Sequence, residues 1–197
     1  MFYEFDGIRP VVHESAFVHP QAVVVGNVEI GKKVYVGPGA VIRGDWGEVI
    51  ISDGCNIQEN CVVHMFPGIS VIFEVEAHIG HGAVIHGATI GKNTLVGMNA
   101  VIMDRCIIGR DCIIGALTFI KSGRVIPDRS IVVGNPGRIV KEVPDKMIDW
   151  KSDGTALYQK LPEQWKSMST PCEPVRDRRK NPITQPKSYK TWKETQS

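Results

Sequence analysis

The chain has 197 residues, with 23 basic and 21 acidic side chains and a formal net charge of +2. This length suffices for one domain with a substantial core. No arginine cluster is interleaved with aromatic residues, so nucleic acid binding has no support. The longest apolar runs are far shorter than a membrane span, and no basic segment followed by an apolar stretch opens the chain. We therefore expect a cytoplasmic protein that binds neither nucleic acid nor membrane.

A repeat of six residues runs through most of the chain. From Val12 to Val132 an aliphatic residue returns about every sixth position, and most of these residues are followed four places later by a small one. A period of six fits neither an α-helix nor a simple strand, but it is typical of a left-handed parallel β-helix, in which three hexapeptides form one triangular coil. We predict an all-β left-handed parallel β-helix domain over residues 1–140.

Four of the five cysteines occupy the small positions of this repeat: Cys55, Cys61, Cys106 and Cys112. In other repeats alanine stands at the same position, which points inward. We therefore expect these cysteines to be core residues, and neither metal ligands nor disulfide partners.

The repeat is interrupted twice. The step from Ile42 to Ile51 is nine residues and the step from Val63 to Phe73 is ten, so we expect residues 45–48 and 65–70 to bulge out as loops. The side chains with the most chemistry lie beside these interruptions: Arg43, Asp45, His64, His81 and His86. The departures from the repeat therefore mark the candidate site.

Counting faces of the coil places these side chains relative to one another. If each loop counts as one step, three core positions lie on one face of successive coils, about 4.8 Å apart like neighbouring strands: Ile42, Val63 and Ile85. The residues that follow them form one outward column: Arg43, His64 and His86. His81 comes two places after Ile79 and belongs to the preceding face.

Two histidines one coil apart can share a metal ion, because zinc–nitrogen bonds of about 2.0–2.1 Å bring the two nitrogens close together. His81 reaches that metal only from a neighbouring subunit, which a three-fold symmetric trimer would provide. Three imidazoles leave a fourth position for water, as in catalytic zinc sites. We predict a homotrimer that binds zinc, or alternatively iron(II) or cobalt(II), through His64, His81 and His86. The remaining histidines are expected to be surface residues without a function: His13, His19 and His78.

After Val132 the repeat gives way to another pattern. Turn-forming residues at 134–138 end the coils, and helical spacing predicts a helix within residues 141–170 that packs on them. Its expected apolar stripe consists of Ile148, Leu157, Leu161, Trp165 and Met168. Residues 171–197 hold many charges and prolines without a period, which predicts an extended or disordered tail. Residues 141–197 carry 12 basic and 8 acidic side chains, an excess that suits either a solvated surface or contacts with CoA phosphates.

Three motifs around these residues resemble the signature of the gamma-class carbonic anhydrase family. They are Arg43-Gly44-Asp45, residues 56–64 (NIQENCVVH) and residues 78–87 (HIGHGAVIHG). Residues 95–104 and the pattern between residues 150 and 161 are similar to a bacterial branch of that family, formed by phenylacetic-acid-degradation and carnitine-operon proteins. The resemblance covers about residues 5–165.

The resemblance implies roles for individual residues. His64, His81 and His86 correspond to histidines that bind zinc or another divalent metal at trimer interfaces. Arg43 and Asp45 correspond to a pair that links subunits near the metal, and Gln58 corresponds to a residue that positions metal-bound water. These assignments agree with the face count, which places the same three histidines around one shared metal.

The sequence departs from the archetype of the family along the path by which protons leave the site. An acidic residue follows the Arg-Gly-Asp motif in the archetype, whereas Trp46 stands here, and the loop at residues 65–69 is apolar. Fast CO2 hydration to bicarbonate needs proton export as well as zinc hydroxide, so we expect it to be weak. The bacterial branch is associated with acyl-CoA thioester hydrolysis. We therefore expect a metal-dependent hydrolase that uses metal-bound hydroxide on an acyl-CoA thioester.

Four side chains beside the histidines are candidates for catalysis: Arg43, Asp45, Gln58 and Glu59. Arg43 can stabilise developing negative charge, and Gln58 can orient water. Glu59 lies in the same outward phase as His81 on the coil beneath, as a base or a partner of that histidine. An exposed, solubilising carboxylate is an equally good interpretation of Glu59.

Two other function classes remain open. One is a CoA-dependent hexapeptide acetyltransferase, in which a single histidine acts as a base without a metal. The other is a non-catalytic scaffold subunit of a larger assembly. Metal content separates the acetyltransferase from the other two classes most directly.

Overall fold

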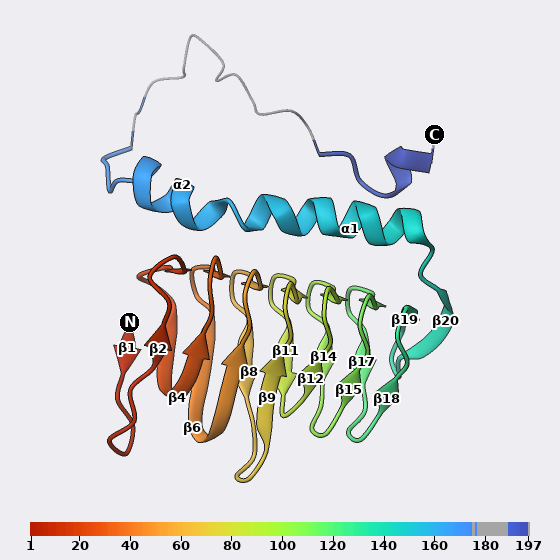
Figure 1. Cartoon of the computed structure of the whole chain (residues 1–197), viewed down its shortest axis with the longest axis horizontal. Helices are drawn as coiled ribbons and strands as arrows, with labels where there is room; N and C mark the ends of the chain where they lie inside the picture. The colour runs from red at the N-terminus through yellow and green to blue at the C-terminus, as the bar shows by residue number, and fades with distance from the viewer. Residues whose placement is uncertain (175, 177–188, 197) are drawn as a thin grey trace.

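Each hexapeptide contributes a short strand, and the strands stack in three parallel columns around an aliphatic core (Figure 1). The structure, a computed structural model, describes residues 1–174, 176 and 189–196. The coils form a left-handed parallel β-helix of about seven turns, which confirms the predicted fold class.

The first and second faces of the coil belong to one 12-stranded sheet, because two long strands continue around the corner between them. These are β4 (Val23–Ile30) and β6 (Val41–Ile51). The first face stacks the N-terminal half of β6, β8 (Val62–His64), β11 (Val84–His86), β14 (Val101–Ile102) and β17 (Phe119–Ile120). The second face stacks the C-terminal half of β6, β9 (Ser70–Phe73), β12 (Thr89–Ile90), β15 (Ile107–Ile108) and β18 (Val125–Ile126). At the N-terminal end, β4 also pairs with β1 (Phe2–Tyr3) and β2 (Val11–Val12).

The third face is a separate sheet of eight strands. In stacking order it contains β3 (Phe17–Val18), β5 (Tyr35–Val36), β7 (Asn56–Ile57), β10 (His78–Ile79), β13 (Leu95–Val96), β16 (Ile113–Ile114), β19 (Ser130–Val133) and β20 (Arg138–Glu142). All of these pairs are parallel except β19 with β20, which is antiparallel and ends the solenoid.

The core is built from the repeat positions. The aliphatic residues and the small residues between them form one buried cluster that runs along the whole solenoid. All four cysteines of the repeat are buried and free, which confirms that they are core residues without a disulfide partner. Burial also raises the pKa of Cys55 and of Cys61 to about 12, so both thiols stay protonated at neutral pH.

The first interruption bulges out as expected, but it does so within a strand and not as a loop. Residues 45–48 lie within β6, which stays paired with β4 on both sides of a register shift. Two facing glycines allow this close approach, because a Cβ on Gly44 would lie 2.2 Å from the carbonyl oxygen of Asn27. The second interruption does contain a loop, whose exposed part is the turn around Pro67. Met65, at its start, is fully buried.

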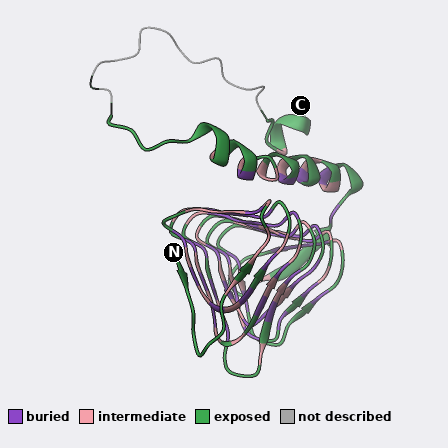
Figure 2. Cartoon of the chain, turned by 60° about the vertical axis from the view of Figure 1, so that its left-hand side comes forward, coloured by how far each residue is buried: buried purple, intermediate pink, exposed green. Residues whose placement is uncertain are grey.

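Two helices, α1 (Asp145–Tyr158) and α2 (Leu161–Met168), run along the third face (Figure 1). The predicted apolar stripe is wrong in its details, because Leu157 and Met168 are exposed. The buried residues of α1 are instead Met147, Lys151 and Thr155, and Figure 2 shows the buried side of the helix facing the coils. Hydrogen bonds explain the difference, since Nζ of Lys151 donates to the carbonyl oxygen of Glu76 at 2.8 Å and to Oδ1 of Asn93 at 2.7 Å.

The described end of the tail lies against α1. Oη of Tyr189 donates to the carbonyl oxygen of Trp150, and the Trp150 and Trp192 rings lie 6.1 Å apart. A 3-10 helix follows at Lys193–Gln196. The expectation of an extended or disordered tail is therefore wrong for residues 189–196, while residues 175, 177–188 and 197 lie outside the described part. Within residues 1–174, 176 and 189–196, no helix is long and apolar enough to cross a membrane.

The buried Lys151 predicts a dependence of stability on pH. Burial lowers the pKa of Lys151 from 10.5 to about 7, whereas a lysine in the unfolded chain keeps its proton to about pH 10. Between these values the unfolded state binds more protons, so this side chain makes the free energy of unfolding rise with pH, by about 2 kcal/mol from pH 7 to pH 9. Denaturant unfolding of the wild type and Lys151→Met at fixed protein concentration measures this difference in slope. The exposed Lys146→Met on the same helix is the control, and equal slopes in all three proteins would contradict the assignment.

Candidate functional site

The register of the first face confirms the outward column. Ile42 pairs with Val63, and His64 pairs with His86 on the next coil. Because Arg43 follows Ile42, its side chain leaves the same face as the two imidazoles. The rings of His64 and His86 lie 5.4 Å apart, centroid to centroid.

Arg43, Asp45 and His64 form a polar cluster at the corner between the first and second faces. Nε2 of His64 lies 2.9 Å from the Arg43 guanidinium and 2.9 Å from Oδ1 of Asp45. A single ring nitrogen either donates to the carboxylate or accepts from the guanidinium. Asp45 and His64 are largely buried, with 13% and 12% of their side chains exposed. Asp45 is the first residue after the Gly26–Gly44 pair, where the register of β4 and β6 shifts.

Asp104, two places after a core isoleucine of β14, holds His86. Nδ1 of His86 lies 2.7 Å from Oδ1 of Asp104, and the Asp104 side chain is only 11% exposed. Aromatic rings cover the two histidines from the insertions on either side: Trp46 lies 5.2 Å from His64, and Phe66 lies 4.9 Å from His86. The histidine pair therefore sits in a partly apolar surround.

His81 lies on a turn at another corner, between the third and first faces, as the face count predicts. Its Nδ1 is 2.5 Å from Oε2 of Glu59, which confirms that Glu59 lies beneath His81 on the previous coil. Oη of Tyr35 donates to the other carboxylate oxygen of Glu59 at 3.1 Å. Burial and the Glu59 charge raise the pKa of Tyr35, which keeps the hydroxyl protonated as a donor.

Gln58 is buried and lies on the third face, away from the column of His64 and His86. Its Nε2 donates to Oδ1 of Asn56 at 2.9 Å and to Nε2 of His78 at 2.6 Å. The expectation for His78 is wrong, because α1 covers it and Thr155 accepts from its Nδ1 at 3.3 Å. One chain therefore does not bring Gln58 to the histidine pair.

Two residues of the site were absent from the sequence interpretation. Asp104 follows Ile102 by two places, the same offset that separates His81 from Ile79, so the repeat contained a signal for it. Tyr35 immediately precedes a core valine, where most repeats carry an ordinary outward side chain. Its contact with Glu59 had no signal, because it depends on the direction of both side chains.

His81 and His86 are each oriented by a carboxylate that leaves Nε2 directed away from it. Asp104 and Glu59 occupy Nδ1 of His86 and of His81, and across the described ranges no hydrogen bond reaches Nε2 of either ring. Such carboxylate–histidine pairs are typical of metal ligands, because they set the tautomer and direct Nε2 outward. Within residues 1–174, 176 and 189–196 of a single chain, no group of three or more acidic, histidine or cysteine side chains could hold a metal.

Comparison with known proteins identifies the family. The bacterial transferase hexapeptide family (six repeats) matches residues 9–44 and 87–122. The carnitine operon protein CaiE of Escherichia coli K12 is 46% identical over 160 residues, which cover 81% of this chain and 82% of that protein. Its counterpart from Escherichia coli O7:K1 is 42% identical over 180 residues, covering 91% of this chain and 92% of the relative. The chain belongs to the CaiE family of hexapeptide-repeat proteins.

Two solved structures have the same fold as this CaiE family chain. A crystal structure of a Bacillus cereus protein provisionally assigned as an acetyltransferase has a TM-score of 0.83 and 28% identity, covering 85% of this chain and 98% of that one. A hexapeptide transferase family protein from Anaplasma phagocytophilum has a TM-score of 0.80 and 27% identity, covering 83% and 97%. The CaiE family chain is therefore an enzyme or an enzyme-related hexapeptide-repeat protein.

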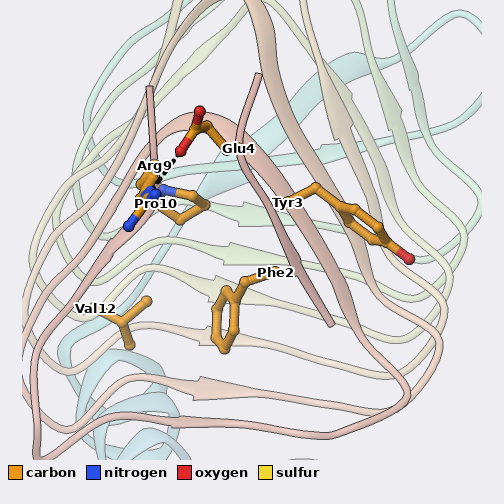
Figure 3. A pocket seen from close by; sticks show the side chains of 6 residues that line it. All are labelled: Phe2, Tyr3, Glu4, Arg9, Pro10 and Val12. Carbon is orange, nitrogen blue, oxygen red and sulfur yellow. Dashed lines mark hydrogen bonds and ion pairs between the residues drawn. The ribbon is translucent and has the colours of Figure 1, made fainter. Parts of the chain in front are cut away.

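A pocket at the N-terminal end of this CaiE family chain contains none of the candidate residues (Figure 3). It measures about 510 Å³ and is lined by Phe2, Tyr3, Glu4, Arg9, Pro10 and Val12. Its two charged side chains neutralise each other, since Nε of Arg9 lies 2.5 Å from Oε2 of Glu4. This pocket therefore presents no unpaired charge to a ligand.

His78 of this CaiE family chain is predicted to remain neutral throughout the physiological pH range. Burial, together with the neighbouring charges of Lys151 and His81, lowers the pKa of His78 from 6.5 to about 3. NMR titration should show constant His78 ring shifts between pH 5 and pH 8. Gln58→Glu replaces the donor to Nε2 with a carboxylate and should move the midpoint upward into that range. A wild-type midpoint near pH 6.5 would show that α1 does not cover the ring.

Proposed function

We propose that this protein is a metal-dependent hydrolase of acyl-CoA thioesters that works as a homotrimer. In each interface, His64 and His86 of one subunit and His81 of the next would hold one divalent metal, with zinc as the first candidate and iron(II) or cobalt(II) as alternatives. The observation that carries the proposal is the pair of carboxylates, Asp104 and Glu59, that hold Nδ1 of His86 and His81. Isolated surface histidines have no need of such partners.

An apolar column on the first face supports the trimer. The outward positions of its strands pair in register from coil to coil: Val23, Val41, Val62, Val84, Val101 and Phe119. The corresponding column of the third face is covered by α1 and α2, whereas Val62 is 40% exposed. A second copy of the chain would cover this apolar face. It would also complete the site, because the histidine pair at the edge of the face lacks a third ligand.

Nε2 of His64 must change its partners for this site to form. In one chain Arg43 and Asp45 contact that nitrogen at 2.9 Å. The family resemblance assigns these two residues to contacts between subunits, and such contacts would release the imidazole. In the single chain 43% of the Arg43 side chain is exposed, and from this position it would act as a cation for a developing oxyanion.

The metal, when bound, would supply a Lewis acid that activates water at neutral pH. The protein supplies the surround: Trp46 and Phe66 restrict water around the histidine pair and offer an apolar surface to an acyl chain. Glu59 holds His81 and can accept a proton through that contact. Trp46 and Phe66, the aromatic residues beside the histidine pair, are 51% and 53% exposed, and neither side chain can carry a proton to solvent for CO2 hydration.

A CoA-dependent acetyltransferase is the second candidate. Its support is the similarity to the Bacillus cereus and Anaplasma phagocytophilum structures. A single histidine would suffice for that reaction as a base. The carboxylate-held pair of His81 and His86 favours the hydrolase, and metal content distinguishes the two.

Mixed trimers test the shared site. We expect His81→Ala and His86→Ala each to abolish metal binding while the circular dichroism of the solenoid is unchanged, because both imidazoles point away from the core. Co-expression of the two variants should restore metal at interfaces where an intact His81 meets an intact pair of His64 and His86. Elemental analysis of the purified wild-type, single-variant and mixed trimers measures this. A monomer that retains full metal, or no recovery in mixed trimers, would contradict the proposal.

The reaction preference is a separate prediction. We expect metal-dependent turnover of small or aromatic acyl-CoA thioesters and weak CO2 hydration limited by proton transfer. Small imidazole buffers should then accelerate CO2 hydration and leave thioester hydrolysis nearly unchanged, since the departing thiolate accepts a proton in the second reaction. Assays of both reactions on the zinc and iron forms at several buffer concentrations measure this. Fast, buffer-independent CO2 hydration without thioesterase activity would identify a plain carbonic anhydrase instead.

A further inference from the structure

A groove lies beside His86 at the corner between the first and second faces. It measures about 610 Å³ and is lined by Phe66, Pro67, Ile69, Asp104, Arg105, Ser122 and Gly123. Asp104 links the groove to the candidate site, because its carboxylate accepts from Nδ1 of His86. Phe66 forms a second link, since its ring lies edge-on to His86 at 4.9 Å.

The two walls of the groove differ in chemistry. The insertion between β8 and β9 contributes the apolar wall. The opposite wall consists of turns on successive coils: the amide of Arg105 donates to the carbonyl oxygen of Gly87 at 2.6 Å, and the amide of Gly123 donates to that of Asp104 at 2.8 Å. The groove therefore runs down the corner from His86 across two coils.

Arg105 lines this polar wall, and Lys121 and Arg124 flank the lining residues Ser122 and Gly123 in the sequence. Arg105, Lys121 and Arg124 are exposed, and none of them forms a salt bridge with any residue that the structure describes. The only acid lining the groove, Asp104, is already hydrogen-bonded to His86. In contrast, the turn arginines Arg110 and Arg129 are both paired with carboxylates. The corner thus holds an uncompensated positive charge next to an apolar wall.

We propose that this groove binds the CoA portion of the substrate. Arg105, Lys121 and Arg124 would contact its phosphates, and the apolar wall would hold the chain that leads to the thioester at His86. Guanidinium and ammonium groups are the usual partners of phosphate in proteins. The proposal rests on the proposed thioesterase function, and it assigns the phosphate contacts to this corner instead of to the basic C-terminal residues.

Arg105 has a left-handed backbone, with φ of 58°, which guides the choice of variant. Asparagine adopts this conformation more readily than alanine, and Asn60, Asn93 and Asn99 have it in other turns of this solenoid. Arg105→Asn therefore removes the charge while the turn is preserved. Arg124→Ala completes the double variant, and Arg110→Ala, an exposed arginine on another turn, is the matched control.

Calorimetric titration with two probes tests the groove in the full-length protein. For CoA we expect the double variant to raise the Kd about tenfold, as for the loss of charged hydrogen bonds, and Arg110→Ala to leave it unchanged. For pantetheine, which lacks the phosphates, we expect the wild type and the double variant to have the same Kd. An unchanged Kd for CoA in the double variant would overturn the proposal, as would an equal loss for both probes.

Activity separates this proposal from the function on which it rests. If the wild type binds CoA through the groove but hydrolyses no thioester, the groove holds and the proposed hydrolase fails. If acyl-CoA is hydrolysed with the same KM by the wild type and the double variant, the hydrolase holds and the groove fails. The expected result is a raised KM for acyl-CoA, an unchanged kcat and an unchanged KM for acyl-pantetheine.

Discussion

Hydrogen bonding between successive coils is the constraint on which the other features of this protein depend. Each strand pairs in parallel with the strand one coil away. Equivalent residues on successive coils therefore form a column, in which neighbours lie about 4.8 Å apart. The inward columns consist of aliphatic or small residues, because their side chains fill the narrow interior of the coil and are buried from water. Outward columns are free to differ, and one of them sets His64 beside His86 while another leaves an apolar stripe on the first face.

The chemistry gathers at one corner because the backbone departs from the hexapeptide rule there. Gly26 and Gly44 face each other, and their lack of side chains lets β4 and β6 approach closely at the corner and pair again after a register shift. The extra residues place Asp45, Trp46 and Phe66 around the histidine pair. Because side chains fill the core of a solenoid, a reactive site has to be built on its surface, where such insertions depart from the repeat.

Much of the candidate site could be predicted from the repeat, but the hydrogen-bond partners of its histidines could not all be predicted. The phase of His81 above Glu59, and of His64 beside His86, follows from counting in sixes. The phase of Asp104 also follows from the repeat, but its contact with His86 depends on where both side chains point, which the repeat does not specify. The buried side of α1 differs from the predicted apolar stripe for a related reason. An apolar stripe identifies the buried side of a helix only when the buried side chains are apolar. Lys151 is polar, and it is buried because it donates hydrogen bonds to Glu76 and Asn93.

The amino-acid sequence by itself determined the solenoid, its register and the faces from which the three histidines project, because a period of six residues stacks in only one regular way. The tertiary structure decided the rest. It kept the first interruption inside β6, covered His78 with α1, placed Gln58 beside His78 and set the unpaired Arg105 in the groove beside His86. These outcomes depend on contacts between residues far apart in the chain, at corners and beneath a helix, where a local repeat carries no information.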